Sequence, residues 1–341
     1  MRRERQSGAA LLIALLIMTL VATLAAGMVW LQWRGIEVET AERARTQGEW
    51  LLNASLDWGN LILRSSIRTN SYKDDDLGQP WATPLAETKL SSFLSADGSH
   101  NADGGPEAYL SGQITDATSK YNLYNLLVDQ NKTNNVTPTS EIVRLQILFR
   151  AIGVSPDVAT TIADGLRDSW GSQQHPAAPP GGQATPTNSV LMPVQVDDLV
   201  WLGVDPKVVK QIEPFVQLIP LVSQGTLATV NANTAPAEVL MAACPVLTRA
   251  QAEQIILQRR QQPFQTVAAV TSNLGLGPSG CAIATGQQPD AIFDVKSQFF
   301  EIFGQLRYEQ HVIRERSVIM RGGPYDPIKV LRRERLPPDA A

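Results

Sequence analysis

The N-terminal part of the chain is dominated by one long apolar segment. Residues 9–33 contain no Asp, Glu, Lys or Arg. A helix of that length, rising about 1.5 Å per residue, can cross a hydrocarbon core of about 30 Å. Apolar residues then recur at roughly helical spacing among charged ones, which predicts a single helix over residues 9–67. Gly35 and Gly48 leave open the alternative of an anchor followed by a separate helix.

Basic residues precede the apolar segment. Arg2, Arg3 and Arg5 are opposed only by Glu4, so the positive-inside rule predicts a cytoplasmic N-terminus, with the rest of the chain across the membrane. The apolar core of a secretory signal peptide is about 7–15 residues long, which is shorter than this segment. Two interpretations stay open: a plain membrane anchor, and a filament subunit processed at Gly8.

Further along the chain, strand-like and helix-like patterns alternate. Apolar and polar residues alternate over 109–127, which predicts a strand pair. Residues 138–285 read as short helical units separated by Gly and Pro. After them, alternation returns and predicts two antiparallel strands joined near 304–312, then a short strand at 328–334. A β region is therefore split by a helical insertion.

An internal repeat marks the starts of helices within that insertion. "GVSPDVATTI" (153–162) and "GVDPKVVKQI" (203–212) share Gly-Val, a capping residue, Pro and a later Ile, and "PVLTRAQAEQI" (245–255) is a weaker copy. Ser155, Asp205 and Thr248 are the predicted N-caps, each preceded by an apolar residue suited to a hydrophobic staple.

Composition places limits on function. The chain has 341 residues, 43% of them hydrophobic, and a net charge of −4, which predicts two domains and does not favour a polyanionic partner. Cys244 and Cys281 are the two cysteines. Both are predicted to lie outside the cytoplasm, where disulfides persist, so they form a candidate disulfide whose geometry the sequence leaves open.

Converging catalytic groups are absent from the sequence. His100, His175 and His311 have no metal-ligand spacing to Cys, Asp or Glu, and no phosphate-binding glycine loop, G-x-S-x-G or H-E-x-x-H occurs. We therefore expect a protein that is not an enzyme.

Five segments together resemble a known family, the minor pseudopilins K of type II secretion systems. They are "RQSG", "YNLYNLL" after "ITDATSK", "PTNSVLMPVQVDDLVWLGV", "VNANTAPAEVLMAACP", and "SQFFEIFGQLR" followed by "SVIMRGG". They occur in this order over nearly the whole chain. The resemblance implies an α+β, pilin-like fold, in which a long N-terminal helix packs on a small antiparallel sheet and a large all-α domain is inserted between the strands.

The resemblance also implies a division of the chain. It predicts a prepilin leader at 1–8, an apolar transmembrane and assembly helix at 9–33, an amphipathic helix continuation with the first part of the pilin-like domain at 34–125, an inserted helical domain at 126–285, and completing strands at 286–341. Prepilin peptidase would cut after Gly8 and leave an N-methylated Ala9.

Assembly follows from the same resemblance. Before assembly the apolar helix would lie in inner-membrane lipid, with the bulk of the chain in the periplasm. Afterwards the subunit would cap a periplasmic pseudopilus that serves protein export across the outer membrane, with minor pseudopilins I and J as partners. The residues available for helix packing are Leu11, Leu12, Ile13, Leu15 and Leu16.

Position 13 sets this chain apart from most pilin-like subunits, which carry a glutamate at the fifth mature position to neutralise the terminal amine of the next subunit toward the tip. Here that position is Ile13. A carboxylate in an apolar helix bundle is costly unless it is paired. A subunit with nothing ahead of it has no amine to meet, so Ile13 fits the tip. Ile13 equally fits an ordinary position in a membrane helix.

Calcium and nucleic acid are the remaining ligands to consider. The family resemblance implies calcium binding by clustered acids, but here only Asp164 and Asp168 align, whereas Ca²⁺ takes about 6–8 oxygen ligands. Calcium is therefore possible by family resemblance, but its ligand pattern is poorly matched here, and no other cofactor is predicted. The repeated Gly-Val turns, with Arg249, Arg259 and Arg260 nearby, give an alternative function: a permanently anchored periplasmic protein with a DNA-binding helix-hairpin-helix. The acidic net charge argues against it.

Overall fold

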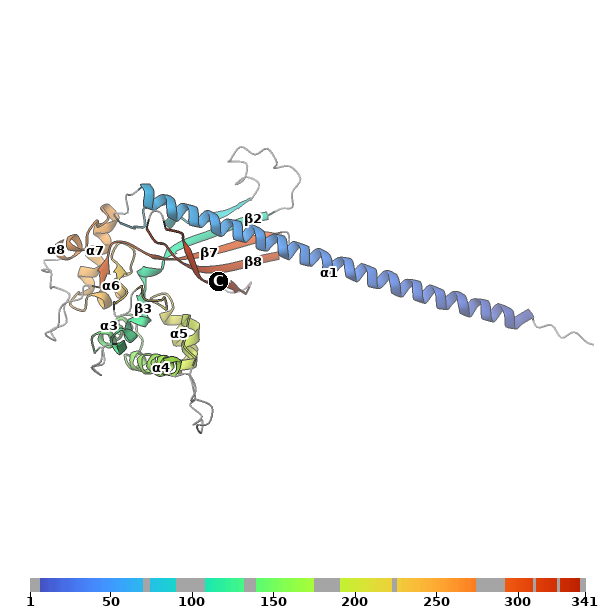
Figure 1. The fold of residues 1–341 in the computed structure, drawn as a ribbon, viewed down its shortest axis with the longest axis horizontal. Coiled ribbons are helices and arrows are strands. Elements are labelled where there is room, and N and C mark those ends of the chain that lie inside the picture. Colours follow the sequence, from blue (N-terminus) through green and yellow to red (C-terminus); the bar gives the residue numbers. More distant parts are fainter. Residues whose placement is uncertain are drawn as a thin grey trace, which may run out of the picture.

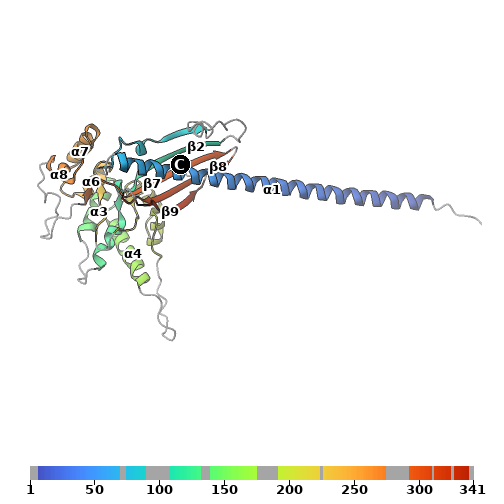
Figure 2. The same ribbon diagram turned by 45° about the horizontal axis from the view of Figure 1, so that its top comes forward.

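A computed structural model gives the fold of the chain (Figures 1 and 2). It describes residues 7–69, 74–89, 108–131, 139–174, 191–222, 226–273, 292–308, 311–323 and 326–337. A long helix, a five-stranded sheet and a cluster of short helices make up these residues. The predicted α+β fold is confirmed.

One continuous helix, α1, spans Ser7–Thr69. Gly35 does not interrupt it, and Gly48 faces the sheet, where a Cβ would lie 2.5 Å from Ile313 Cδ1. The absence of a side chain at Gly48 therefore lets the helix approach the sheet closely. The single helix predicted over residues 9–67 is confirmed, and the alternative of two separate helices is wrong.

The main sheet is antiparallel and has the strand order β1-β2-β7-β8-β9. Its strands are Leu85–Lys89, Ala108–Asp116, Phe299–Tyr308, His311–Met320 and Lys329–Leu336. β2 and β7 are adjacent from Ala108↔Tyr308 to Asp116↔Phe300, although the helical segments separate them in sequence. The last three strands match the strands predicted at the C-terminus.

The second half of α1 packs on this sheet (Figure 2). Leu56 and Leu63 contact a cluster that includes Trp81, Phe300 and Ile302. The alternating burial of β7 explains this contact, because every second side chain of a strand faces the same layer. By contrast, the first half of α1 extends away from the sheet (Figure 1).

Short helices form a second body at the end of the sheet (Figure 1). They are α3 (Thr139–Ala151), α4 (Asp157–Gln174), α5 (Pro206–Ile212), α6 (Ala237–Ala243), α7 (Arg249–Gln261) and α8 (Val267–Asn273). Two pairs of two-residue parallel strands join them: β3 (Tyr121–Asn122) with β4 (Val216–Gln217), and β5 (Val230–Asn231) with β6 (Phe293–Asp294). One apolar core runs from Tyr121 to Val295. The domain boundaries at 125/126 and 285/286 stay predictions.

The repeat corresponds to real helix starts. Asp205 accepts from Lys207 N at 2.7 Å, and Thr248 forms a complete capping box with Gln251. Gly153 and Gly203 both adopt positive φ, 77° and 85°, which explains why each repeat has glycine there. The predicted caps at Asp205 and Thr248 are confirmed, and Asp157 N donates to Ser155 Oγ at 3.4 Å.

Of the strand pair predicted over 109–127, the first strand is present as β2, but the pairing is wrong, because the second is only the two-residue β3 and pairs with β4. β2 ends at Asp116, whose side chain accepts from Thr118 N. Residues 117–119 and 123–131 are then 3-10 helices. The partners of β2 are β1 and β7. A side-chain hydrogen bond to the backbone two residues later favours a turn over a continued ladder, which is the physical reason for the error.

Three buried polar side chains, Tyr121, Glu141 and Arg144, hold the start of the helical body in place. The Tyr121 hydroxyl donates to Glu141 Oε2 at 2.6 Å, and Arg144 pairs with Glu141 Oε1 at 3.0 Å. Arg144 also donates to the Ala243 carbonyl on α6. Burial, reinforced by the Glu141 charge, raises the pKa of the Tyr121 hydroxyl well above its ordinary value. Tyr121 therefore stays protonated and remains a hydrogen-bond donor.

Candidate functional site: the exposed assembly helix and the polar junction

The apolar half of α1 is exposed along its length, although its composition is that of a buried segment. The five residues predicted for helix packing are 52–69% exposed: Leu11, Leu12, Ile13, Leu15 and Leu16. The helix is long and apolar enough to cross a membrane. In water so much contiguous apolar surface is unfavourable, so this half must lie in lipid or against other protein.

The predicted processing residues lie at the beginning of this helix. Gly8 and Ala9 fall in its first turn, and Ile13 is 59% exposed. Residues 1–6 of the predicted leader lie outside the described residues. The arrangement places the predicted cleavage point at the far end of α1 from the folded body (Figure 1).

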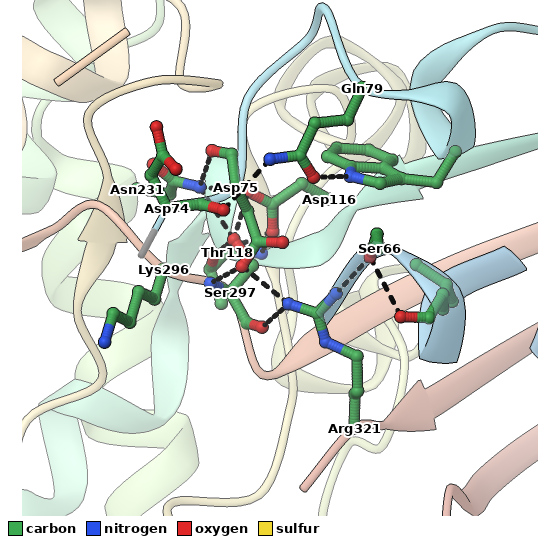
Figure 3. A network of polar contacts seen from close by, with 12 residues as sticks. Ser66, Asp74, Asp75, Gln79, Asp116, Thr118, Asn231, Lys296, Ser297 and Arg321 are labelled. Atoms are coloured by element: carbon green, nitrogen blue, oxygen red, sulfur yellow. Dashed lines mark hydrogen bonds and ion pairs between the residues drawn. The ribbon is translucent and has the colours of Figure 1, made fainter. Parts of the chain in front are cut away.

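A buried group of polar side chains lies where the sheet meets the helical body (Figure 3). We call Asp75, Asp116, Asn231, Ser297 and Arg321 the polar junction. All five are at most 3% exposed. They come from the segment after α1, the end of β2, β5, the segment before β7, and the residue after β8.

Asp116 is the centre of the polar junction. Its Oδ2 accepts from Ser297 Oγ at 2.5 Å, from Thr234 Oγ1 at 2.5 Å and from Asn231 Nδ2 at 3.0 Å. Burial raises the pKa of the Asp116 carboxyl above its ordinary value, while the hydrogen bonds from Ser297 and Thr234 oppose that rise. The strand β2 is thus bonded directly to two residues of the helical body.

Arg321 closes the other side of the polar junction. Its guanidinium pairs with Asp75 Oδ2 at 2.6 Å and donates to the Ser297 carbonyl at 2.8 Å and to Ser66 Oγ at 3.1 Å. It also lies 4.5 Å from the centre of the Phe300 ring. The Arg321 side chain therefore connects α1, the loop after it, the start of β7 and the end of β8.

The polar junction has the chemistry of a structural clamp. Each carboxylate is buried and accepts from several donors, which is the arrangement that makes buried charge tolerable. The hydroxyl of Ser297 that donates to Asp116 is fully buried, and among the described residues no group of three or more His, Cys, Asp or Glu side chains could hold a metal ion. The sequence did not single out these five residues.

Asp164 and Asp168, the two aspartates considered as calcium ligands, lie together on α4. Asp164 is 61% exposed at its side chain and pairs with Arg167 at 3.0 Å. Asp168 lies one turn further along the same helix. The structure brings no third acidic ligand of the described chain to them. The adjoining residues 175–190 lie outside the described part.

Cys244 and Arg259 both make bonds that stabilise the fold. Cys244 is buried and disulfide-bonded, and Cys281 lies outside the described residues. Arg259 donates to the carbonyls of Ala232 and Ala235, and burial lowers its pKa to about 10.

Arg249 is engaged as well, because it pairs with Glu238 and Glu253, each at 3.1 Å. Two of the three arginines near the Gly-Val turns are therefore occupied within the fold. These partners within the fold do not favour the DNA-binding alternative, in which arginines contact phosphates.

The chain is similar to proteins of bacterial secretion. Residues 230–288 match the family model "Type II secretion system (T2SS), protein K". The type II secretion system protein K of Pectobacterium carotovorum subsp. carotovorum is 25% identical over 348 residues, which cover 97% of both chains. The protein of the same name from Pseudomonas aeruginosa is 26% identical over 290 residues, 80% of this chain and 78% of that one.

A solved structure has the same fold. It is the crystal structure of the GspK-GspI-GspJ complex from the enterotoxigenic Escherichia coli type 2 secretion system. The TM-score is 0.57 at 17% identity, over 87% of this chain and 98% of that one. Over most of its length the chain is thus similar to type II secretion system K proteins, and it shares the fold of a chain of the solved complex.

Proposed function

We propose that this chain is the minor pseudopilin at the tip of the periplasmic pseudopilus of a type II secretion system, acting in pseudopilus assembly and in protein export across the outer membrane. The observation that carries the proposal is the exposed apolar half of α1, joined without interruption to a half that packs on the sheet. Such a helix can leave lipid and pack against other helices while the folded body stays unchanged.

Processing belongs to the same proposal. Prepilin peptidase would cut after Gly8, and Ala9 would become the methylated N-terminus. Gly8 and Ala9 lie at the end of α1 remote from the folded body, where a membrane peptidase could reach them without unfolding it. Minor pseudopilins I and J are the proposed partners, supported by the similarity to a GspK solved together with GspI and GspJ.

The tip position is supported by two features. Ile13 provides no carboxylate for the terminal amine of a subunit ahead of it, and the helical body widens the molecule at the end of the sheet away from the apolar helix (Figure 1). A wide body along the shaft of a fibre would obstruct the subunits that follow, whereas at the end of the fibre it obstructs nothing.

The disulfide supports a periplasmic location for the folded body. Cys244 is disulfide-bonded, and Cys281 is the other cysteine of the sequence. We infer that these two are joined. Disulfides persist in the bacterial periplasm and are rare in the cytosol. This location agrees with a precursor that crosses the inner membrane once with its N-terminus in the cytoplasm.

Immunogold labelling of assembled fibres tests the tip position. Full-length chain carrying an epitope after Ala341 is produced with the other pseudopilins of its system. We expect gold particles at one end of each fibre, with no regular label along the shaft. A fibre labelled at intervals along its length would exclude the tip function while leaving a pseudopilin function intact.

A further inference from the structure

We propose that Trp30, Trp33 and Arg34 bind lipid headgroups at the periplasmic surface of the inner membrane, with the Arg34 guanidinium on a lipid phosphate. We call these three residues the interfacial anchor. The inference rests on the proposed function, since it concerns the precursor before it leaves the membrane. It adds to that function the residues that set the depth of α1 in the bilayer.

The length of the apolar segment gives the position of the interfacial anchor. Trp30 lies 20 residues after Ala10, which at about 1.5 Å per residue corresponds to the hydrocarbon core of about 30 Å. The headgroup region adds about 5–7 Å on each side. Trp33 and Arg34 lie about 4–6 Å beyond Trp30 along the helix. With Ala10 at the cytoplasmic boundary, all three residues therefore lie at the opposite interface.

Aromatic residues of the apolar segment are confined to its periplasmic end. Residues 9–29 contain no Phe, Trp or Tyr, and Trp30 and Trp33 follow directly. Trp is enriched at membrane interfaces, because its ring is apolar while its N–H bonds to water or headgroups. Trp30 is 55% exposed and Trp33 is 58% exposed. Both rings are therefore open to lipid at the depth where Trp is favoured.

Arg34 adds a positive charge at the same depth. It is the first charged residue after Arg5, and its Cζ lies 5.8 Å from the centre of the Trp30 ring. Among the residues that the structure describes, Arg34 forms no ion pair with a carboxylate, whereas Arg43 on the same helix pairs with Glu39. The planar guanidinium matches phosphate oxygens with two parallel hydrogen bonds. A lipid phosphate is thus the counter-ion that fits this position.

The interfacial anchor occupies one face of α1, because residues three and four apart are neighbours on a helix surface. The guanidinium also limits how far the helix can enter the bilayer. With an uncharged residue at position 34, the uncharged segment would end at Ile36 instead of Trp33, about 4.5 Å further along the helix. Ile36 is 60% exposed, so lipid could then cover it. Without Arg34 we therefore expect α1 to shift toward the cytoplasm.

Tryptophan quenching by brominated lipids tests the depth in the full-length precursor, purified from cells without prepilin peptidase. The chain is reconstituted alone into vesicles of phosphatidylethanolamine and phosphatidylglycerol, with bromines either near the headgroup or near the chain ends. The double variant Trp30→Phe, Trp33→Phe measures how much of the quenching belongs to these two of the seven tryptophans. For that part, we expect the shallow bromines to quench at least twofold more than the deep ones.

Arg34→Leu tests the guanidinium, with Arg43→Leu as the matched control about 13 Å further along the helix. We expect Arg34→Leu to move the two rings deeper, so that the ratio of shallow to deep quenching falls at least twofold. Arg43→Leu should leave this ratio unchanged, because the Arg43 side chain, which is 72% exposed, lies beyond the headgroups.

The phosphate contact has its own readout. Native mass spectrometry of the detergent-solubilised precursor measures the binding of added phosphatidylglycerol or of a galactolipid, which has no phosphate. We expect Arg34→Leu to weaken phosphatidylglycerol binding at least threefold, and Arg43→Leu to leave it unchanged. Galactolipid binding should be the same for all three proteins. Equal phosphatidylglycerol binding by Arg34→Leu and the unmodified precursor would refute the phosphate contact.

The outcomes separate this inference from the proposed function. Stronger quenching of Trp30 and Trp33 by the deep bromines, or a depth that Arg34→Leu does not change, would overturn the interfacial anchor and leave the membrane-inserted precursor in place. If neither set of bromines quenched these two tryptophans, α1 would not enter the bilayer at all. That result would count against the proposed function itself.

Discussion

Replacing Arg321 with alanine is expected to lower the free energy of unfolding by about 3–5 kcal/mol, the usual cost of removing one partner of a buried ion pair. Arg321 is 1% exposed, and its partner Asp75 is 3% exposed. Without the guanidinium, the Asp75 carboxylate keeps the Ser297 N–H at 2.8 Å but loses its positive partner. Chemical denaturation of the full-length chain in detergent, followed by circular dichroism, measures the loss.

A matched control separates this burial effect from the loss of an arginine in general. Arg43 pairs with Glu39 on α1, and both side chains are largely exposed. For such a pair we expect Arg43→Ala to change the free energy of unfolding by less than about 1 kcal/mol. If Arg321→Ala cost no more than Arg43→Ala, the polar junction would not be what holds the sheet, α1 and the loop after it together.

Replacing Ile13 with glutamate is expected to reduce secretion strongly, by at least about tenfold, because the new carboxylate would enter an apolar helix bundle without a positive partner. Ile13→Leu keeps the side chain apolar and of similar volume, so we expect secretion near that of the unmodified protein. The measurement is the amount of exported protein in the medium from a strain that depends on the plasmid-borne variant.

The comparison between the two variants is specific to the tip. In a subunit with another one ahead of it, a glutamate at this position would meet a terminal amine and be tolerated. Secretion by Ile13→Glu equal to that by Ile13→Leu therefore argues against a first-in-line position. Immunoblotting shows whether both variants are present in the inner membrane at the same level.

Local signals in the sequence predicted several elements well. The long helix follows from uniform apolar composition and then helical spacing, which is a strong signal in a segment of this length. The caps at Asp205 and Thr248 follow from short-range chemistry that involves only neighbouring residues. Alternation in residues 299–308 was also sufficient, because one face of that strand is buried against α1.

Local sequence patterns did not predict the contacts between segments that are distant in the chain. Asp116 read as part of an alternating stretch, but its side chain ends the strand and bonds to Thr234 and Asn231 of the helical body. The strand at 85–89 was missed because its short, mixed sequence has no clear alternation. It is an edge strand with little burial, so its apolar pattern is weak.

The polar junction was not predicted, although four of its residues lie in segments that carry the resemblance to the family. Asp116, Asn231, Ser297 and Arg321 each lie in or beside a segment that carries the resemblance to the family: "ITDATSK", "VNANTAPAEV", "SQFFEIFGQLR" and "SVIMRGG". Sequence alone could not show that these four residues meet, because more than 200 positions separate Asp116 from Arg321. In this chain the four segments meet in one buried clamp.

We propose that the apolar half of α1 is a processed assembly segment and not a permanent anchor. The most direct test is mass spectrometry of the N-terminal peptide, from full-length protein purified from cells with active prepilin peptidase. We predict a peptide that begins at Ala9 and carries one added methyl group, whereas cells without the peptidase yield a chain with residues 1–8 still attached. Retention of those residues in the presence of active peptidase would contradict the claim.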